Sequence, residues 1–355
     1  MQLERYSNER FHLFMRSPLR ALIVLALAAG LLVLFLYNVD LRGVARQIVH
    51  ADPLWLAFSL VTMIVNLSIR AWRWQYLLEP LGRPGFGSSF RATAVGFAAS
   101  TVLPARAGEV IRPYFLARQE NLSATGAFAT IILERVLDMV TVLVLLASYV
   151  LFAAPATTEA NRVAFEAVQW AGLTATVGAI GALVVLFLLA GNPVRLADAL
   201  TRLEAVLPSR LAGLLATVAE KFATGLGVVR RPGRLLVSLA LSFPLWLSIA
   251  AGVWAVAVAF HLAVPFTGSF LVLALLVVGV AVPTPGAVGG FHAAFRFAAT
   301  TFFGAADDAA VGAAIVLHLF TVVPSLLLGL YYAAQVGLNM SRMRELAVTA
   351  PGDAA

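Results

Sequence analysis

The chain has 355 residues, of which 61% are hydrophobic and 12% are charged, with a mean hydropathy of +0.91 and a formal net charge of +7. A soluble domain carries about twice this fraction of charged residues, so the composition excludes a soluble globular protein. We expect no nucleic-acid partner, because arginines held on the cytoplasmic side of a membrane explain the positive charge. The absence of cysteine excludes disulfides and thiolate metal sites.

Six apolar segments are each long enough to cross a bilayer, which takes about 20 residues. No small-residue cleavage site follows the first of them, so we expect a retained anchor rather than a signal peptide. We therefore predict one transmembrane domain over residues 19–338, between a cytoplasmic N-terminal segment (1–18) and a cytoplasmic tail (339–355). The six predicted spans are residues 19–37, 53–78, 123–153, 168–190, 235–261 and 309–338.

Two further apolar stretches, residues 90–118 and 266–303, are each interrupted near the middle. Proline removes a backbone donor and clashes with the preceding turn, so neither stretch is expected to form one straight helix. Each half is too short to span a bilayer alone. We therefore predict two re-entrant helical hairpins whose broken backbone is buried in protein. The breaks are marked by Pro104 and Gly108 in the first hairpin and by Pro283, Pro285, Gly286, Gly289 and Gly290 in the second.

The basic residues predict the orientation of this all-α polytopic membrane protein. With both termini in the cytoplasm, 20 of the 25 Lys and Arg residues lie inside, four lie outside, and Arg135 lies within a span. The positive-inside rule requires such an asymmetry. We expect a multi-pass protein of the cytoplasmic (inner) membrane.

The order span, broken hairpin, span occurs over residues 53–153 and again over 235–338, in opposite orientations. Interrupted segments in matching places of inverted repeats indicate a transporter with its site near the bilayer midplane. The alternative is that both hairpins only fill the core of a helical bundle. Between the repeats, residues 191–234 form a cytoplasmic segment with an amphipathic pattern, which favours a helix at the membrane surface over a contact within the protein.

Three charged residues stand near the middle of the third predicted span. Glu134 lies four residues before Asp138 and Arg135 lies three before it, so each pair meets on one helix face. An ionised side chain at this depth costs at least about 2.5–3.5 kcal/mol, which requires pairing or a wet cavity. Two readings stay open: a salt bridge that clamps the helix to the first hairpin, and a site for an ionic head group or a coupling proton.

The first hairpin adds Arg106, Glu109 and Arg112 just after its break. A helix that begins near Arg106 directs free N–H groups and its positive dipole end at the cavity. With Arg106 and Arg112 beside that helix end, we predict a phosphate or anion site, against the alternative that these arginines only anchor the hairpin.

Two histidines are candidates for proton coupling. His292 follows the glycine-rich break of the second hairpin, four residues before Arg296, and His318 occupies the last span much as Glu134 occupies the third. A membrane histidine is often only hydrogen-bonded within a bundle, but two that face an acidic cluster favour a proton relay.

The second span closes with Arg70, Trp72, Arg73 and Trp74, a pattern typical of an interfacial anchor. No P-loop or catalytic triad occurs, and the five histidines lack metal-ligand spacing. We predict no catalytic residue, no metal site and no cofactor.

Three motifs resemble the lysylphosphatidylglycerol synthase transmembrane-region family, also called flippase-like. They are LPARAGEVIR at residues 103–112, ERVLD at 134–138 and PTPGAVGGF at 283–291. The likeness extends from about residue 19 to 338. The sequence departs from the family pattern at His292, where we expect Glu, and at His318, where Arg is common.

This resemblance implies a membrane domain that handles lipids. In the aminoacyl-phosphatidylglycerol synthases a separate cytosolic domain makes the modified lipid; only about 17 residues follow the last predicted span here, so we expect no such activity. We predict a lipid translocator with membrane lipids as its substrate. The sequence identifies no protein partner, and an oligomer is compatible with it. The alternatives are a membrane-embedded transferase acting on a lipid-linked sugar or phosphate, and a membrane assembly subunit without transport.

Overall fold

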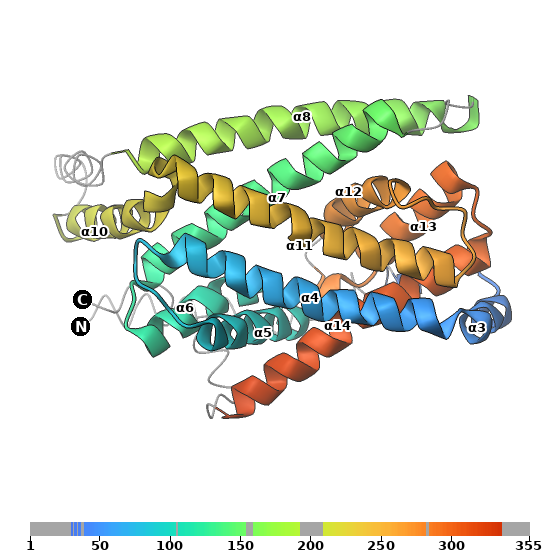
Figure 1. Ribbon diagram of the computed structural model, residues 1–355, viewed down its shortest axis with the longest axis horizontal. Helices are drawn as coiled ribbons and strands as arrows, with labels where there is room; N and C mark the ends of the chain where they lie inside the picture. Colours follow the sequence, from blue (N-terminus) through green and yellow to red (C-terminus); the bar gives the residue numbers. More distant parts are fainter. Residues whose placement is uncertain are drawn as a thin grey trace.

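The computed structural model describes residues 30, 32–33, 35–36, 39–103, 106–153, 159–191, 209–281 and 284–335 (Figure 1). The described residues form helices and their connections, and five of the helices are long and apolar enough to cross a membrane. The predicted all-α polytopic membrane class is therefore confirmed. The first predicted span and both terminal segments fall largely outside the described residues.

Four of the five long helices begin and end within three residues of the predicted limits, whereas the helix Glu159–Leu189 begins nine residues before the predicted span 168–190. At the start of α4 (Pro53–Leu78), Asp52 accepts a hydrogen bond from the N–H of Leu54, and Pro53 takes the first helical position. Ser123 caps α7 (Ala124–Phe152) in the same way. These caps satisfy backbone donors that a helix start leaves free. The five helices are α4 (Pro53–Leu78), α7 (Ala124–Phe152), α8 (Glu159–Leu189), α11 (Pro232–Ala259) and α14 (Asp307–Gln335).

Both interrupted stretches are helical hairpins. The first consists of α5 (Phe86–Val102) and α6 (Gly108–Glu120), and the second of α12 (Gly268–Ala281), the short η4 (Pro285–Ala287) and α13 (Gly290–Phe303). The two hairpins occupy opposite ends of the long axis of the bundle, as hairpins that enter from opposite membrane faces would (Figure 1).

Glycines form the turn of the second hairpin because its backbone has positive φ angles. Gly286 has φ +60° and Gly289 has φ +89°, conformations that cost glycine little. Pro285 opens η4 just before them. Of the predicted break residues, Pro104 and Pro283 lie outside the described residues.

The two halves of the chain make corresponding contacts at a spacing of 182 residues. Asn66 on α4 donates a hydrogen bond to Ser248 on α11, and these residues are 182 apart, so the axis relating the halves passes between them. Helix α5 packs on α14 as α12 packs on α7. Glycine contacts repeat at the same spacing. The contact of Gly43 with Asp308 corresponds to that of Gly225 with Gly126. The contact of Gly108 with Gly96 corresponds to that of Gly290 with Gly279, which is one residue away from the 182-residue spacing.

The correspondence begins before the predicted repeat boundaries. Helix α3 (Leu41–His50) precedes α4 and packs on α14, while α10 (Ser209–Gly225) and η3 (Leu226–Arg230) precede α11 and contact α7. The close approach of Gly225 to Gly126 places the end of α10 against α7. Part of the predicted surface helix therefore contacts the protein itself; residues 192–208 are outside the described part.

Each hairpin closes through a glycine at its inner face. A Cβ on Gly108 would meet the carbonyl oxygen of Gly96 and the backbone of Ser100. Gly108→Ala is therefore expected to destabilise the protein by about 1–3 kcal/mol, because the backbone of α5 has to shift. Thermal unfolding of purified protein checks this against Gly87→Ala, where a Cβ meets nothing within 4 Å. Equal stability of the two variants would contradict the packing role.

Candidate functional site

Two arginines of α4 are buried within the bundle instead of anchoring the chain at the membrane surface. The side chain of Arg70 is 5% exposed and that of Arg73 is fully buried. Trp74 is buried as well and donates to the hydroxyl of Thr130, whereas Trp72 is exposed. The predicted interfacial anchor is thus wrong for three of its four residues. The spacing of three places Arg70 and Arg73 on one helix face, but an interfacial anchor has the same spacing.

These arginines complete a buried cluster with residues of α6 and α7. The arginine cluster consists of Arg70, Arg73, Arg112, Glu134, Arg135 and Asp138. One carboxylate oxygen of Glu134, Oε1, is 3.0 Å from nitrogens of Arg70, Arg112 and Arg135 and 3.4 Å from Arg73. The structure therefore joins the first hairpin, α4 and α7 at Glu134.

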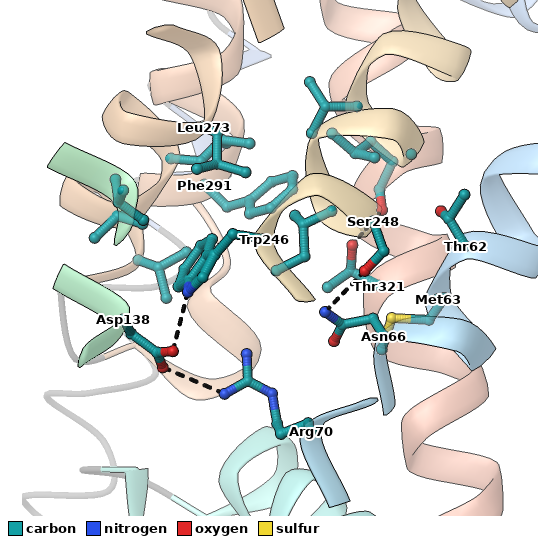
Figure 2. A pocket seen from close by; sticks show the side chains of 18 of the residues that line it. Thr62, Met63, Asn66, Arg70, Asp138, Trp246, Ser248, Leu273, Phe291 and Thr321 are labelled. Atoms are coloured by element: carbon teal, nitrogen blue, oxygen red, sulfur yellow. Dashed lines mark hydrogen bonds and ion pairs between the residues drawn. The ribbon is translucent and has the colours of Figure 1, made fainter. Parts of the chain in front are cut away.

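Asp138 is the second carboxylate of the cluster. Its Oδ1 accepts hydrogen bonds from Arg73 at 2.7 Å and from the indole N–H of Trp246 at 2.9 Å. Its Oδ2 lies 3.4 Å from Arg70 and 3.5 Å from Arg135. Figure 2 shows Asp138 between the Arg70 and Trp246 side chains. Trp246 on α11 brings the second half of the chain to the cluster, a contact that the sequence did not indicate.

The arginine cluster has more positive than negative charge. Four guanidinium groups face two carboxylates, so its formal charge is +2. Several guanidinium nitrogens, including Nε of Arg70 and Nε of Arg135, are buried without a hydrogen-bond partner among the described residues. An uncompensated buried charge is costly, so a bound anion would stabilise this arrangement.

A cavity of about 420 Å³ lies beside the cluster, between the two halves of the chain. Its charged lining residues are Arg70, Arg106, Arg135 and Asp138, and Asn66 and Ser248 meet at its wall (Figure 2). Most of the remaining wall is apolar. Arg135 and Arg106 keep 38% and 40% of their side chains exposed, so both are accessible cations.

The cavity is lined by equivalent positions of the two halves, but their chemistry differs. At the spacing of 182 residues, Arg70, Arg135 and Asp138 correspond to Gly252, Leu317 and Phe320, and all six line the cavity. The first half thus supplies charge where the second half supplies apolar surface. Such a cavity suits a molecule with an anionic end and an apolar end.

The predicted residues of the first hairpin divide between two places. Arg106 donates to the carbonyl of Val280 on α12 at 2.6 Å and pairs with Glu109 at 3.7 Å, so it links the two hairpins at the cavity. Arg112 pairs with Glu134 and stacks 4.0 Å over the ring of Trp74. Arg112 therefore supports the cluster from behind the cavity wall.

The two histidines form a separate group. Their ring centroids are 4.4 Å apart; His292 Nδ1 accepts from the N–H of Gly289, and His318 Nε2 donates to the carbonyl of Gly286 at 2.6 Å. Arg296 pairs with Asp307 instead. In the described part of the chain, no hydrogen bond joins either histidine to Glu134 or Asp138, so a proton relay stays a prediction. The described residues contain no group of three or more His, Asp or Glu side chains that could hold a metal ion.

The burial of Arg70, Arg73 and Arg112 changes the basis of the orientation argument. These side chains belong to the interior of the bundle and do not count as cytoplasmic charge. In the predicted orientation 17 cytoplasmic basic residues remain without these three, against four outside, so the asymmetry persists. The orientation stays a prediction.

The chain is similar to known membrane proteins. The sequence profile described as "Lysylphosphatidylglycerol synthase TM region" matches residues 21–329. Over 122 residues the chain is 30% identical to "Glycosyltransferase AglD" of Haloferax volcanii and 23% identical to "UPF0104 membrane protein MJ1595" of Methanocaldococcus jannaschii. Each match covers 34% of this chain, and the two cover 19% and 36% of the relatives' own lengths.

Proposed function

Because this chain belongs to the lysylphosphatidylglycerol synthase transmembrane-region family, we propose that it is a lipid translocator of the cytoplasmic membrane. Its substrate is a polar-headed, phosphate-bearing lipid, and both termini of the chain lie in the cytoplasm. The observation that carries this proposal is the cavity between the two halves, with cationic side chains on one side and apolar side chains on the other.

The cavity has the position that transport requires. It lies at the interface of two corresponding halves, which is where inverted-repeat transporters bind substrate and where the halves rock against each other. Arg70, Arg106 and Arg135 hold the phosphate through charge-assisted hydrogen bonds, which are about twice as strong as neutral ones. The lipid tails lie along the apolar side of the cavity and in the bilayer.

A membrane-embedded transferase is the second candidate, supported by the name of the Haloferax volcanii relative. Its base would be a carboxylate at the cavity, and Asp138 is the carboxylate among the described lining residues. Asp138 is already held by Arg73 and Trp246, which disfavours this role. Conversion of a lipid by the purified protein would favour the transferase. Purification with a stoichiometric partner, and no transport, would favour an assembly subunit.

Filling the cavity tests the proposal directly. Thr321 lines the cavity, and its hydroxyl bonds only to its own helix at Leu317, so Thr321→Trp is expected to keep the fold. Its bulk should reduce translocation of fluorescent phospholipids in proteoliposomes several-fold. The control is Thr174→Trp on the exposed face of α8. Translocation at the protein-free rate by the wild type, or full activity of Thr321→Trp, would contradict the proposal.

A further inference from the structure

We propose that the cavity selects lipids whose head group ends in a dianionic phosphate, a phosphomonoester or a diphosphate, and rejects cationic head groups. This inference rests on the proposed lipid-translocating function. It concerns the charge of the substrate, which neither the fold nor the family match assigns.

The formal charge of the arginine cluster supports a dianion. Four guanidinium groups and two carboxylates leave +2. A terminal phosphate carries about −1.5 to −2 near pH 7 and offers three acceptor oxygens. It therefore balances the cluster, whereas a phosphodiester supplies one negative charge and a zwitterionic head group supplies none overall.

The accessible donors also match a terminal phosphate. Among the described residues, Arg135 and Arg106 are the two partly exposed cations on the cavity wall, and the mostly buried Arg70 lies on the same wall. One planar guanidinium group can bind two phosphate oxygens at once through two of its N–H groups. Three arginines from α4, α7 and the first hairpin can thus address separate oxygens of one phosphate.

Among the described lining residues, the cavity offers no carboxylate that is free to pair with a cationic head group. Both oxygens of Asp138 are occupied, Oδ1 by Arg73 and Trp246 and Oδ2 by Arg70 and Arg135. Glu134 has an oxygen, Oε2, without a partner, but its side chain is fully buried and does not line the cavity. An ammonium group in the cavity would therefore meet arginines on one side and apolar surface on the other, which is unfavourable.

The test compares lipids that differ only in the head group. Proteoliposomes with the wild-type protein receive phosphatidic acid, phosphatidylglycerol, phosphatidylcholine or lysylphosphatidylglycerol, each carrying the same fluorescent label on one tail. At pH 7.5 we expect phosphatidic acid to move at least about five times faster than phosphatidylglycerol, after subtraction of the protein-free rate. The zwitterionic and cationic lipids should stay at the protein-free rate.

The same four lipids are also measured for retention by the purified protein in native mass spectrometry. Movement or retention of the cationic or zwitterionic lipid at the level of phosphatidic acid would overturn the selectivity while leaving the lipid-translocating function standing. If none of the four is moved or retained, the proposed function falls, and the selectivity with it.

Lowering the pH changes the charge of a terminal phosphate and therefore tests the preference for a dianion within one lipid. The second proton of a phosphomonoester binds with a pKa near 6, so movement of phosphatidic acid should fall several-fold between pH 7.5 and 5.5. Phosphatidylglycerol has no proton that binds in this range. Protonation of His292 or His318, which lie beside the second hairpin turn, would change both lipids together. A parallel decline of both would therefore overturn the dianion preference.

Discussion

Glu134→Gln is expected to lower the free energy of unfolding by about 3–5 kcal/mol, the cost of removing one partner from a buried ion pair. Glu134 touches all four arginines of the cluster and is fully buried. Without its charge, four guanidinium groups face one remaining carboxylate, and the formal charge of the cluster rises from +2 to +3. The variant should therefore be less stable than the wild type whether or not a lipid is present.

Thermal unfolding of the purified variants in detergent measures this effect. The control Glu109→Gln neutralises a carboxylate that is 36% exposed in a 3.7 Å pair, and a pair of this kind contributes at most about 1 kcal/mol. Adding Arg112→Gln to Glu134→Gln should recover about 1–2 kcal/mol relative to the sum of the single changes, because neighbouring charges couple. A Glu134→Gln protein as stable as the wild type would show that Glu134 does not hold the cluster together.

The sequence predicted the long helices well because their signals are local. Apolar length determines a membrane span, and α4 starts where Asp52 and Pro53 predict. The two hairpin breaks were predicted for the same reason, since proline and glycine interrupt helices through their own backbone chemistry.

The burial of Arg70 and Arg73 is a tertiary effect and has no local signal that separates it from an anchor. Arginine and tryptophan near the end of an apolar helix have the same pattern at a membrane surface and in a bundle interior. What decides between them is the position of Glu134 and Asp138, about 65 residues later in the chain. The site predicted from the sequence therefore included Arg135 of α7 but lacked the two arginines that α4 contributes.

The correspondence of residues between the two halves could not be predicted from the sequence either. It rests on small residues that let helices approach, such as Gly108 against Gly96 and Gly225 against Gly126. At the cavity the side chains of corresponding positions differ in character, as Arg70 and Gly252 or Asp138 and Phe320 do. The chemistry of one half therefore does not predict the chemistry of the other.

Arg135→Gln should have the opposite profile to Glu134→Gln. Arg135 lines the cavity and is 38% exposed, and its removal lowers the charge of the cluster from +2 to +1. We expect stability within about 1 kcal/mol of the wild type, because the variant relieves repulsion among the remaining arginines. Loss of a charge-assisted hydrogen bond to phosphate costs about 1.5–3 kcal/mol, so phospholipid translocation should fall at least about tenfold.

The pair of variants distinguishes the two roles that the charged residues of α7 can have. Proteoliposome translocation and thermal unfolding are measured on the same preparations, with Arg162→Gln on the exposed part of α8 as the matched control. A stable but inactive Arg135→Gln protein means that Arg135 serves the substrate, while Glu134 serves the fold. If Arg135→Gln is instead as unstable as Glu134→Gln, Arg135 is part of the structural clamp and the phosphate site must rest on Arg70 and Arg106.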